Sequence, residues 1–313
     1  MRANAVVMEQ PRQLVLAELE LTDPTESDVV VDVDFSGIST GTEKLLWTGR
    51  MPPFPGMGYP LVPGYESVGR IVEAGTRSGR SAGEQVFVPG ARCFGDVRGL
   101  FGGAASRLVV DGQRAHPYRE SLGEQGALLA LAATAFHALA LASDGGSQLV
   151  VGHGVLGRLI ARLALLRFGT APTVWETDAK RADGAAGYRV LHPSQDECRS
   201  YRTIIDASGN VGAIDGLVAR LAHGGDIILA GFYAERVAFD FPPAFLREAR
   251  FQIAAEWQQA DLQAVLNLTE KGLLSLDGLI SHRRTYRDAD EAYRTAFMDP
   301  DCLKMILDWR NCT

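Results

Sequence analysis

A glycine-rich segment has the residue types and spacing whose chemistry is easiest to assign. Residues 152–157 read Gly-His-Gly-Val-Leu-Gly. Three glycines at this spacing allow a tight turn, a close approach of the backbone to a pyrophosphate, and close packing of a helix on a strand. The N–H groups at the start of that helix would bind the phosphates. The segment therefore predicts a dinucleotide site at Gly152, Gly154, Val155, Leu156 and Gly157.

The residues on either side of this segment agree with the prediction. An apolar run at 149–151 is typical of a buried strand, and a helical pattern follows at 155–168. Glu176 ends the next strand-like run, roughly two dozen residues after the first glycine. A carboxylate there would hydrogen-bond the cofactor ribose and repel the extra phosphate of NADP. The sequence therefore favours NAD, although Lys180 and Arg181 could assist a phosphate.

Two further segments of the same region follow apolar runs. Ala207 and Ser208 follow the run at 203–205, and Gly231 follows the run at 226–230. Ligands of open α/β sheets bind at the carboxyl ends of the strands. We therefore expect these three residues to border the nicotinamide end of the cofactor.

The elements that must position these residues change in type along the chain. Short β-branched runs at 29–35, 67–73 and 85–89 are separated by glycines and prolines, which is typical of a β-rich domain. Beyond a long helical pattern at 122–141, helical patterns alternate with short strands. That alternation predicts βαβ units and a parallel sheet.

The predicted fold class is therefore α/β, with a doubly wound Rossmann sheet and a second, β-rich domain. We expect the Rossmann domain at 120–279 and the β-rich domain at 1–119 and 280–313. The last segment contains a helical pattern at 289–298 and an apolar run at 304–307.

Composition excludes several classes of function. The net charge of −7 and the pI near 5.4, without a basic run, argue against a nucleic-acid partner. The four cysteines lie far apart and form no CxxC pair, which is typical of reduced thiols. The N-terminus has no apolar signal segment, and the apolar stretch at 127–142 is too short to span a membrane comfortably. We expect a cytoplasmic protein without membrane insertion, which leaves peripheral contact open.

Taken in order, several pieces of the chain resemble the medium-chain dehydrogenase/reductase superfamily. The matching pieces are residues 36–39, 63–69 and 102–106, together with the cofactor segments described above. The resemblance covers essentially the full length. It implies that the β-rich domain is GroES-like and that the protein forms a homodimer through the sheet of the cofactor domain.

The departures from that superfamily concern the metal. Zinc-dependent members carry Cys, His and Cys or Glu where this chain has Ser39, Tyr65 and Ala130, and only Glu66 is retained. The lobe that normally has four closely spaced cysteines keeps Cys93 alone. A catalytic zinc needs three protein ligands. We therefore expect no bound metal.

Within the superfamily, the sequence resembles the bacteriochlorophyllide dehydrogenase family at residues 36–44, 58–66 and 175–177 and at Trp47. That resemblance implies NAD-linked oxidation of a secondary alcohol on a chlorin-type small-molecule substrate, giving an acetyl group. Positive charge that develops as hydride leaves would be delocalised into the conjugated ring, so a Lewis acid is needed less. A positioned acid/base could then suffice.

Tyr65 is the first candidate for the acid/base, because it occupies the place of a metal ligand. Ser39, Thr42 and Glu66 could pass its proton onward. Each also has a structural interpretation: Tyr65 as a filler of the metal pocket, Glu66 as the partner of an arginine, and the two hydroxyls as backbone caps. Of the histidines, His153 is expected to face solvent.

Two other functions are consistent with the same sequence. One is a zinc-independent quinone or enone reductase of this superfamily, which would use NADPH. The other is a catalytically silent dinucleotide-binding protein. A preference for NADPH would distinguish the reductase from the NAD-dependent dehydrogenase. A protein that binds NAD but turns over neither an alcohol nor an enone would be the silent binding protein.

Overall fold

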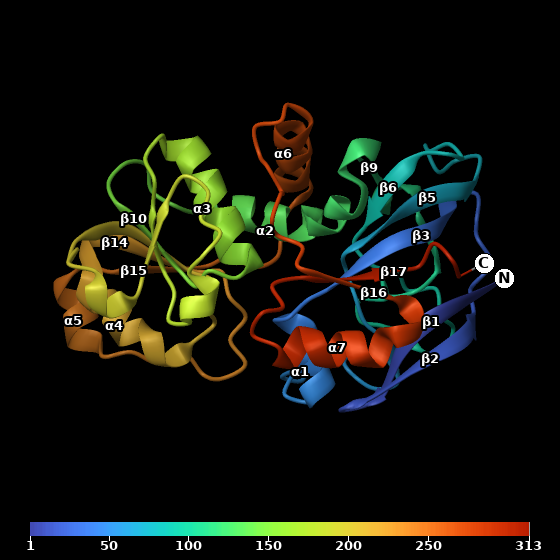
Figure 1. The fold of residues 1–313 in the computed structure, drawn as a ribbon, viewed down its shortest axis with the longest axis horizontal. Helices are drawn as coiled ribbons and strands as arrows, with labels where there is room; N and C mark the ends of the chain where they lie inside the picture. The colour runs from blue at the N-terminus through green and yellow to red at the C-terminus, as the bar shows by residue number, and fades with distance from the viewer. Residues whose placement is uncertain (313) are drawn as a thin grey trace. The chain divides into compact units, whose positions relative to one another are not determined.

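The computed structural model of the protein describes residues 1–312, which form two compact units (Figure 1). The first unit contains the chain up to Ala130 and the segment that begins at Leu279, and the second runs from Leu131 to Gly278. The first boundary falls later than residue 119, because the short helix η2 (Glu120–Leu128) packs against strands of the first unit. Between residues 1 and 312, no helix is long and apolar enough to cross a membrane.

The second unit is built on one parallel sheet. Its strands are β10 (Gln148–Val151), β11 (Thr173–Trp175), β12 (Arg189–Leu191), β13 (Tyr201–Asp206), β14 (Leu221–Leu229) and β15 (Arg250–Ile253). They are hydrogen-bonded in the order β12-β11-β10-β13-β14-β15, and each neighbouring pair is parallel. Counted along the chain this is the order 3-2-1-4-5-6 of the dinucleotide-binding fold. The predicted doubly wound sheet is confirmed.

The first helix of this unit precedes β10, and each of the others follows a strand. The helices are α2 (Leu129–Ala140), α3 (Val155–Phe168), α4 (Ile214–Arg220), α5 (Phe241–Leu246) and α6 (Gln259–Glu270). The start and end predicted for α3 are confirmed, and Gly169 ends it with φ 67°. The continuous helix predicted at 122–141 is wrong in its first part. Gly123 has φ 49° and ψ −127°, outside the helical range, so η2 comes first and α2 begins at Leu129.

One crossover of the sheet is unusually short. Residues 176–188 connect β11 to β12 and contain only the single 3₁₀ turn η3 (Ala179–Arg181). Parallel strands are usually joined through an α-helix. Here the connection must be held in place by other contacts.

The first unit contains two sheets. Its strands are β1 (Arg2–Gln10), β2 (Gln13–Glu20), β3 (Asp28–Ile38), β4 (Leu61–Val62), β5 (Ser67–Ala74), β6 (Gln85–Val88), β7 (Arg98–Gly99), β8 (Arg107–Asp111), β9 (His116–Pro117), β16 (His282–Thr285) and β17 (Met305–Asp308). One sheet has the order β2-β1-β4-β7. The other runs β16-β17-β3-β5-β6-β9, with β8 also paired to β3. The strands predicted around 29–35, 67–73 and 85–89 are β3, β5 and β6.

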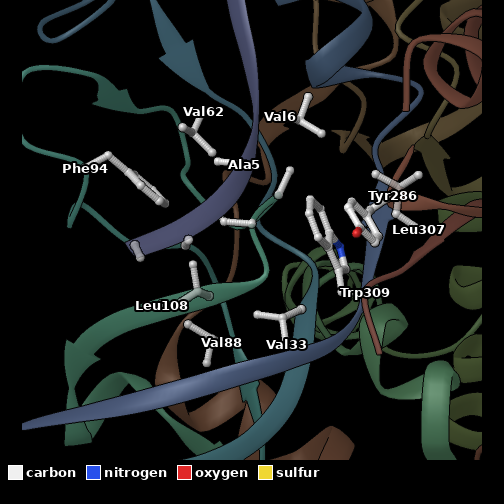
Figure 2. Close-up of a cluster of buried hydrophobic side chains, with 14 of the residues drawn as sticks. Ala5, Val6, Val33, Val62, Val88, Phe94, Leu108, Tyr286, Leu307 and Trp309 are labelled. Atoms are coloured by element: carbon white, nitrogen blue, oxygen red, sulfur yellow. The ribbon is translucent and has the colours of Figure 1, made fainter. Parts of the chain in front are cut away.

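The C-terminal segment is part of the core of this unit. β17 pairs antiparallel with β3, and helix α7 (Ala289–Met298) precedes it at the predicted residues. Figure 2 shows Trp309 and Tyr286 packed among aliphatic side chains of the sheets, with their rings stacked at 5.4 Å. The Trp309 indole N–H donates to the Ser36 hydroxyl on β3 over 2.8 Å. Residues at the two ends of the chain therefore share one core.

Candidate active site

The glycine-rich loop of the second unit has the geometry that a dinucleotide requires. Gly152 follows β10 with φ +95°, a conformation that favours glycine. A Cβ on Gly157 would lie 1.9 Å from the Gly152 carbonyl oxygen, so α3 can approach the loop only with glycine there. A Cβ on Gly154 would meet nothing within 4 Å, and Gly154 is the residue from which α3 starts, followed by Val155 and Leu156. The backbone N–H groups at this helix start could bind phosphates.

The structure brings the other predicted cofactor residues of the sheet to the same edge. The Ala207 N–H donates to the Val151 carbonyl and the Gly231 N–H to the Asp206 carbonyl, at 2.9 and 2.8 Å. A Cβ on Gly152 would lie 3.3 Å from the Ser208 nitrogen, so the ends of β10 and β13 meet. These positions lie at the carboxyl ends of the strands, where α/β sheets bind ligands.

Glu176 is held at the end of β11 by three backbone N–H groups. Its Oε2 accepts from the His153 N–H at 3.0 Å, and its Oε1 accepts from the Thr177 and Asp178 N–H groups at 2.7 and 2.9 Å. An ionised carboxylate offers about four acceptor sites. Glu176 therefore keeps capacity for a ribose hydroxyl while its orientation is fixed.

The expectation that His153 faces solvent is wrong. Its side chain is fully buried, and Nδ1 lies 2.6 Å from the Arg181 carbonyl oxygen. Nε2 lies 2.9 Å from the Tyr188 hydroxyl. Since a carbonyl only accepts, Nδ1 carries the proton and Nε2 accepts from Tyr188. Burial lowers the pKa of His153, which keeps the ring neutral.

In the first unit, the predicted catalytic hydroxyls form one cluster. The Tyr65 and Ser39 hydroxyl oxygens are 2.6 Å apart, and the Tyr65 hydroxyl is also hydrogen-bonded to Thr42 at the start of α1 (Thr42–Thr48). The Phe101 ring packs edge-on against Tyr65. Burial raises the pKa of Tyr65 above its ordinary value, and the nearby Glu66 raises it further. The phenol is therefore neutral near pH 7.

Glu66 follows Tyr65 in the chain, and its side chain is fully buried in an ion pair. The Lys304 ammonium donates to both carboxylate oxygens, at 2.7 and 2.9 Å, and to the Ile38 carbonyl at 3.2 Å. A Cβ on Gly37 would lie 2.1 Å from Glu66 Oε2, so glycine makes room for the carboxylate. The interpretation of Glu66 as the partner of a cation agrees with this geometry, although the partner is a lysine.

The structure adds Glu43, to which the sequence interpretation gave no role. Its side chain is fully buried on α1, where Oε1 accepts from the Ser39 N–H at 2.9 Å and Oε2 accepts from the Tyr293 hydroxyl at 2.8 Å. Burial raises the pKa of Glu43 from 4.5 to about 7; Glu66 adds to the rise, while Lys304 opposes it. Two carboxyls are thus buried near one ammonium group, which is bonded to Glu66. In the sequence, the only indication of a role for Glu43 is that an acidic residue lies four positions after Ser39.

The donor set near Ser39 does not match a zinc site. Of the three residues that the resemblance to the superfamily sets at ligand positions, Ser39 and Tyr65 offer hydroxyl groups and the buried Ala130 offers no donor atom. Across the 312 described residues, no group of three or more His, Cys, Asp or Glu side chains is arranged to hold a metal ion.

Replacing Glu43 by Gln is expected to change how stability depends on pH. Because the folded-state pKa of Glu43 lies above its unfolded value, the wild-type protein loses stability as the pH rises from about 4.5 to about 7. The Gln variant has no such loss and should gain roughly 1–3 kcal/mol relative to wild type between pH 5 and pH 8.5. Urea unfolding at both pH values measures the difference. The exposed Glu73→Gln is the control, and equal pH dependence in both variants would contradict a buried, titrating Glu43.

Comparison with known proteins supports the fold and gives the family. Residues 25–120 match the alcohol dehydrogenase GroES-like domain. The chain superposes on L-idonate 5-dehydrogenase from Escherichia coli with a TM-score of 0.86, at 16% identity, covering 98% of each chain. An E. coli alcohol dehydrogenase solved with NADH gives a TM-score of 0.84 at 21% identity, covering 98% of this chain and 99% of that one. These two likenesses concern the fold alone.

Two curated relatives are much more similar in sequence. The chain is 57% identical over 312 residues to 2-desacetyl-2-hydroxyethyl bacteriochlorophyllide A dehydrogenase of Rhodobacter capsulatus, covering 99% of both chains. It is 56% identical over 315 residues to the protein of the same name from Cereibacter sphaeroides, again covering 99% of both. The chain therefore belongs to the same family as these dehydrogenases, within the medium-chain alcohol dehydrogenases that carry a GroES-like domain.

Proposed function

We propose that this protein oxidises the hydroxyethyl side chain of a bacteriochlorophyllide to an acetyl group, with NAD as the hydride acceptor and without catalytic zinc. The observation that carries the substrate assignment is the 57% identity with a bacteriochlorophyllide A dehydrogenase over nearly the whole of both chains. The reaction places the protein in bacteriochlorophyll a biosynthesis.

The second unit supplies the groups for the cofactor. A nicotinamide held by these residues would supply the acceptor for the hydride of the carbinol carbon. The start of α3 and the glycine loop would bind the pyrophosphate, and Ala207, Ser208 and Gly231 would border the nicotinamide end. The choice of NAD rests on Glu176, whose fixed carboxylate would hydrogen-bond the ribose and repel a 2′-phosphate.

The first unit supplies the groups for the proton that the alcohol loses. A neutral Tyr65 cannot act as a standing phenolate, so it would accept the proton at Oη as it passes its own to Ser39 or Thr42. The partly exposed Thr42 would release its hydroxyl proton to solvent water as it accepts, which completes the transfer. Glu66 is committed to Lys304, so its proposed role changes from proton carrier to fixed negative charge beside Tyr65. Glu43 holds the backbone of Ser39 in place.

The proposal of a zinc-independent reaction rests on the donor set and on the substrate. Serine and tyrosine stand where zinc-dependent members have Cys and His, and Glu66 is already paired with a lysine. Zinc would act by stabilising an alkoxide as a Lewis acid. When the carbinol carbon is attached to a conjugated macrocycle, charge developing there is spread over the ring, which lowers that requirement.

The proposed reaction can be tested directly. Purified protein incubated with NAD and the hydroxyethyl bacteriochlorophyllide should give the absorption shift of the acetyl product, because the new carbonyl extends the conjugation of the macrocycle. Activity should persist after dialysis against EDTA, and elemental analysis should find less than stoichiometric zinc. Loss of activity on chelation with recovery on zinc addition would sink the metal-free mechanism. Turnover of a quinone with NADPH alone would instead favour the reductase.

Tyr65→Phe is expected to lower kcat by about 10²–10⁴-fold, since the variant keeps the ring but loses the hydroxyl that moves the proton. The Kd for NAD should stay within about twofold, because the cofactor groups belong to the other unit. Tyr118→Phe is the matched control: it also loses a hydroxyl hydrogen bond, in the same unit but outside the cluster. If both variants turn over like wild type, Tyr65 has no catalytic role.

We also propose that the protein forms a homodimer through the edge of the parallel sheet. β15 is the last strand of that sheet, and Ile253 at its end is 76% exposed. Phe241, Phe245 and Leu246 on the neighbouring α5 are each at least 66% exposed. Exposed apolar side chains gathered in this way are typical of an interface.

Ile253→Asp should shift the protein towards monomer in analytical ultracentrifugation, because a charge would be buried at the interface. Leu166→Asp, an exposed leucine on α3, is the matched control and should leave the distribution unchanged. A wild-type protein that sediments as a monomer at micromolar concentration would exclude this dimer.

A further inference from the structure

The segment 176–188 that carries Glu176 is held by side chains of the glycine loop and of α3. This segment replaces a crossover helix but lacks the internal hydrogen bonds of one beyond the turn η3. Where its carbonyl groups are shielded from solvent they need donors from elsewhere, because burying an unpaired polar group costs free energy. Two residues outside the segment supply them.

Arg158, in the first turn of α3, donates more hydrogen bonds to the segment than His153 does. Its side chain is buried, and its guanidinium donates to the carbonyls of Asp183 at 2.7 Å, Arg181 at 3.2 Å and Gly184 at 3.3 Å. It also donates to the His153 carbonyl of the glycine loop at 3.0 Å. The planar group therefore ties the segment to the loop that is expected to bind the pyrophosphate. A Cβ on Gly184 would lie 2.3 Å from the guanidinium, and the φ of +83° at this position also favours glycine.

His153 makes the second connection. Its ring joins the Arg181 carbonyl to the Tyr188 hydroxyl, at the middle and end of the segment. Its backbone N–H binds the Glu176 carboxylate at the beginning. One residue of the glycine loop thus contacts the segment at three places, two through its buried imidazole and one through its backbone N–H.

We propose that Arg158 and His153 are positioning residues that set the preference for NAD over NADP, by holding the 176–188 segment in the conformation that fixes Glu176. The proposal rests on the function proposed above. If the segment is already ordered in the free protein, binding of the cofactor does not have to meet the entropy cost of ordering it. The adenosine end of the cofactor is then bound more strongly. If the Glu176 carboxylate cannot change its orientation, it stays close to the 2′-phosphate of NADP and repels it. If the segment loosened, Glu176 could move away and the neighbouring Lys180 and Arg181 would favour the phosphate.

The test compares Arg158→Met, which keeps much of the volume but removes every donor, with Arg167→Met. Arg167 lies on the same helix and also donates to backbone carbonyls, those of Leu139 and Ala142, outside the segment. Calorimetry gives the Kd of NAD and of NADP for each variant, and steady-state kinetics give kcat at saturating NAD. Tyr188→Phe, which removes only the hydroxyl bound by His153, is a milder variant if Arg158→Met fails to fold.

Arg158→Met is expected to raise the Kd of NAD at least tenfold and that of NADP much less, so that the preference falls about tenfold or more. The kcat at saturating NAD should change less than threefold, and Tyr188→Phe should show a smaller change in the same direction. Arg167→Met should keep the wild-type preference. A purely structural role would weaken both nucleotides equally, and an unchanged ratio in the folded variants would overturn the proposal. Wild-type protein that binds neither nucleotide would overturn the proposed function as well.

Discussion

The buried ion pair between Lys304 and Glu66 is the interaction on which the first unit most depends. Both side chains are almost completely removed from solvent, and removing one partner would leave an uncompensated charge in the interior. The pair also joins the C-terminal segment to the loop between β4 and β5, which carries Tyr65. Because a second carboxyl, that of Glu43, lies in the same interior with no cation of its own, the charge balance of the cluster shifts with pH close to neutrality.

This charge balance determines what the hydroxyl cluster can do. The ammonium is committed to Glu66, and the pKa of Tyr65 is raised rather than lowered, by burial first and then by the charge of Glu66. The proposed proton transfer would then be concerted along the Tyr65, Ser39 and Thr42 hydroxyls, each donating as it accepts. A metal ion would have provided positive charge at this place; serine, tyrosine and alanine provide hydrogen-bonding groups and volume instead.

In the second unit, a buried cation is bound by neutral carbonyl groups instead of by a carboxylate. Its shortened crossover contains one 3₁₀ turn, and Arg158 donates to carbonyl groups of the crossover rather than to a carboxylate. A delocalised guanidinium suits this role because its donors lie in one plane and point in several directions. The proposed preference for NAD therefore depends on groups that need not touch the cofactor.

The sequence alone determined the parallel sheet, the limits of α3 and α7, the glycine loop and the positions of Ser39, Tyr65 and Glu176. These follow from local spacing, from short-range periodicity and from ordered motifs. The tertiary structure decided the partners: Lys304 for Glu66, Tyr293 for Glu43, and the carbonyls of 181–184 for Arg158. It also reversed the expected exposure of His153 and divided the helix expected at 122–141. Such contacts join residues tens to hundreds of positions apart, and periodicity carries no information about which distant groups meet, because their pairing is fixed only when burial forces each polar group to find a partner.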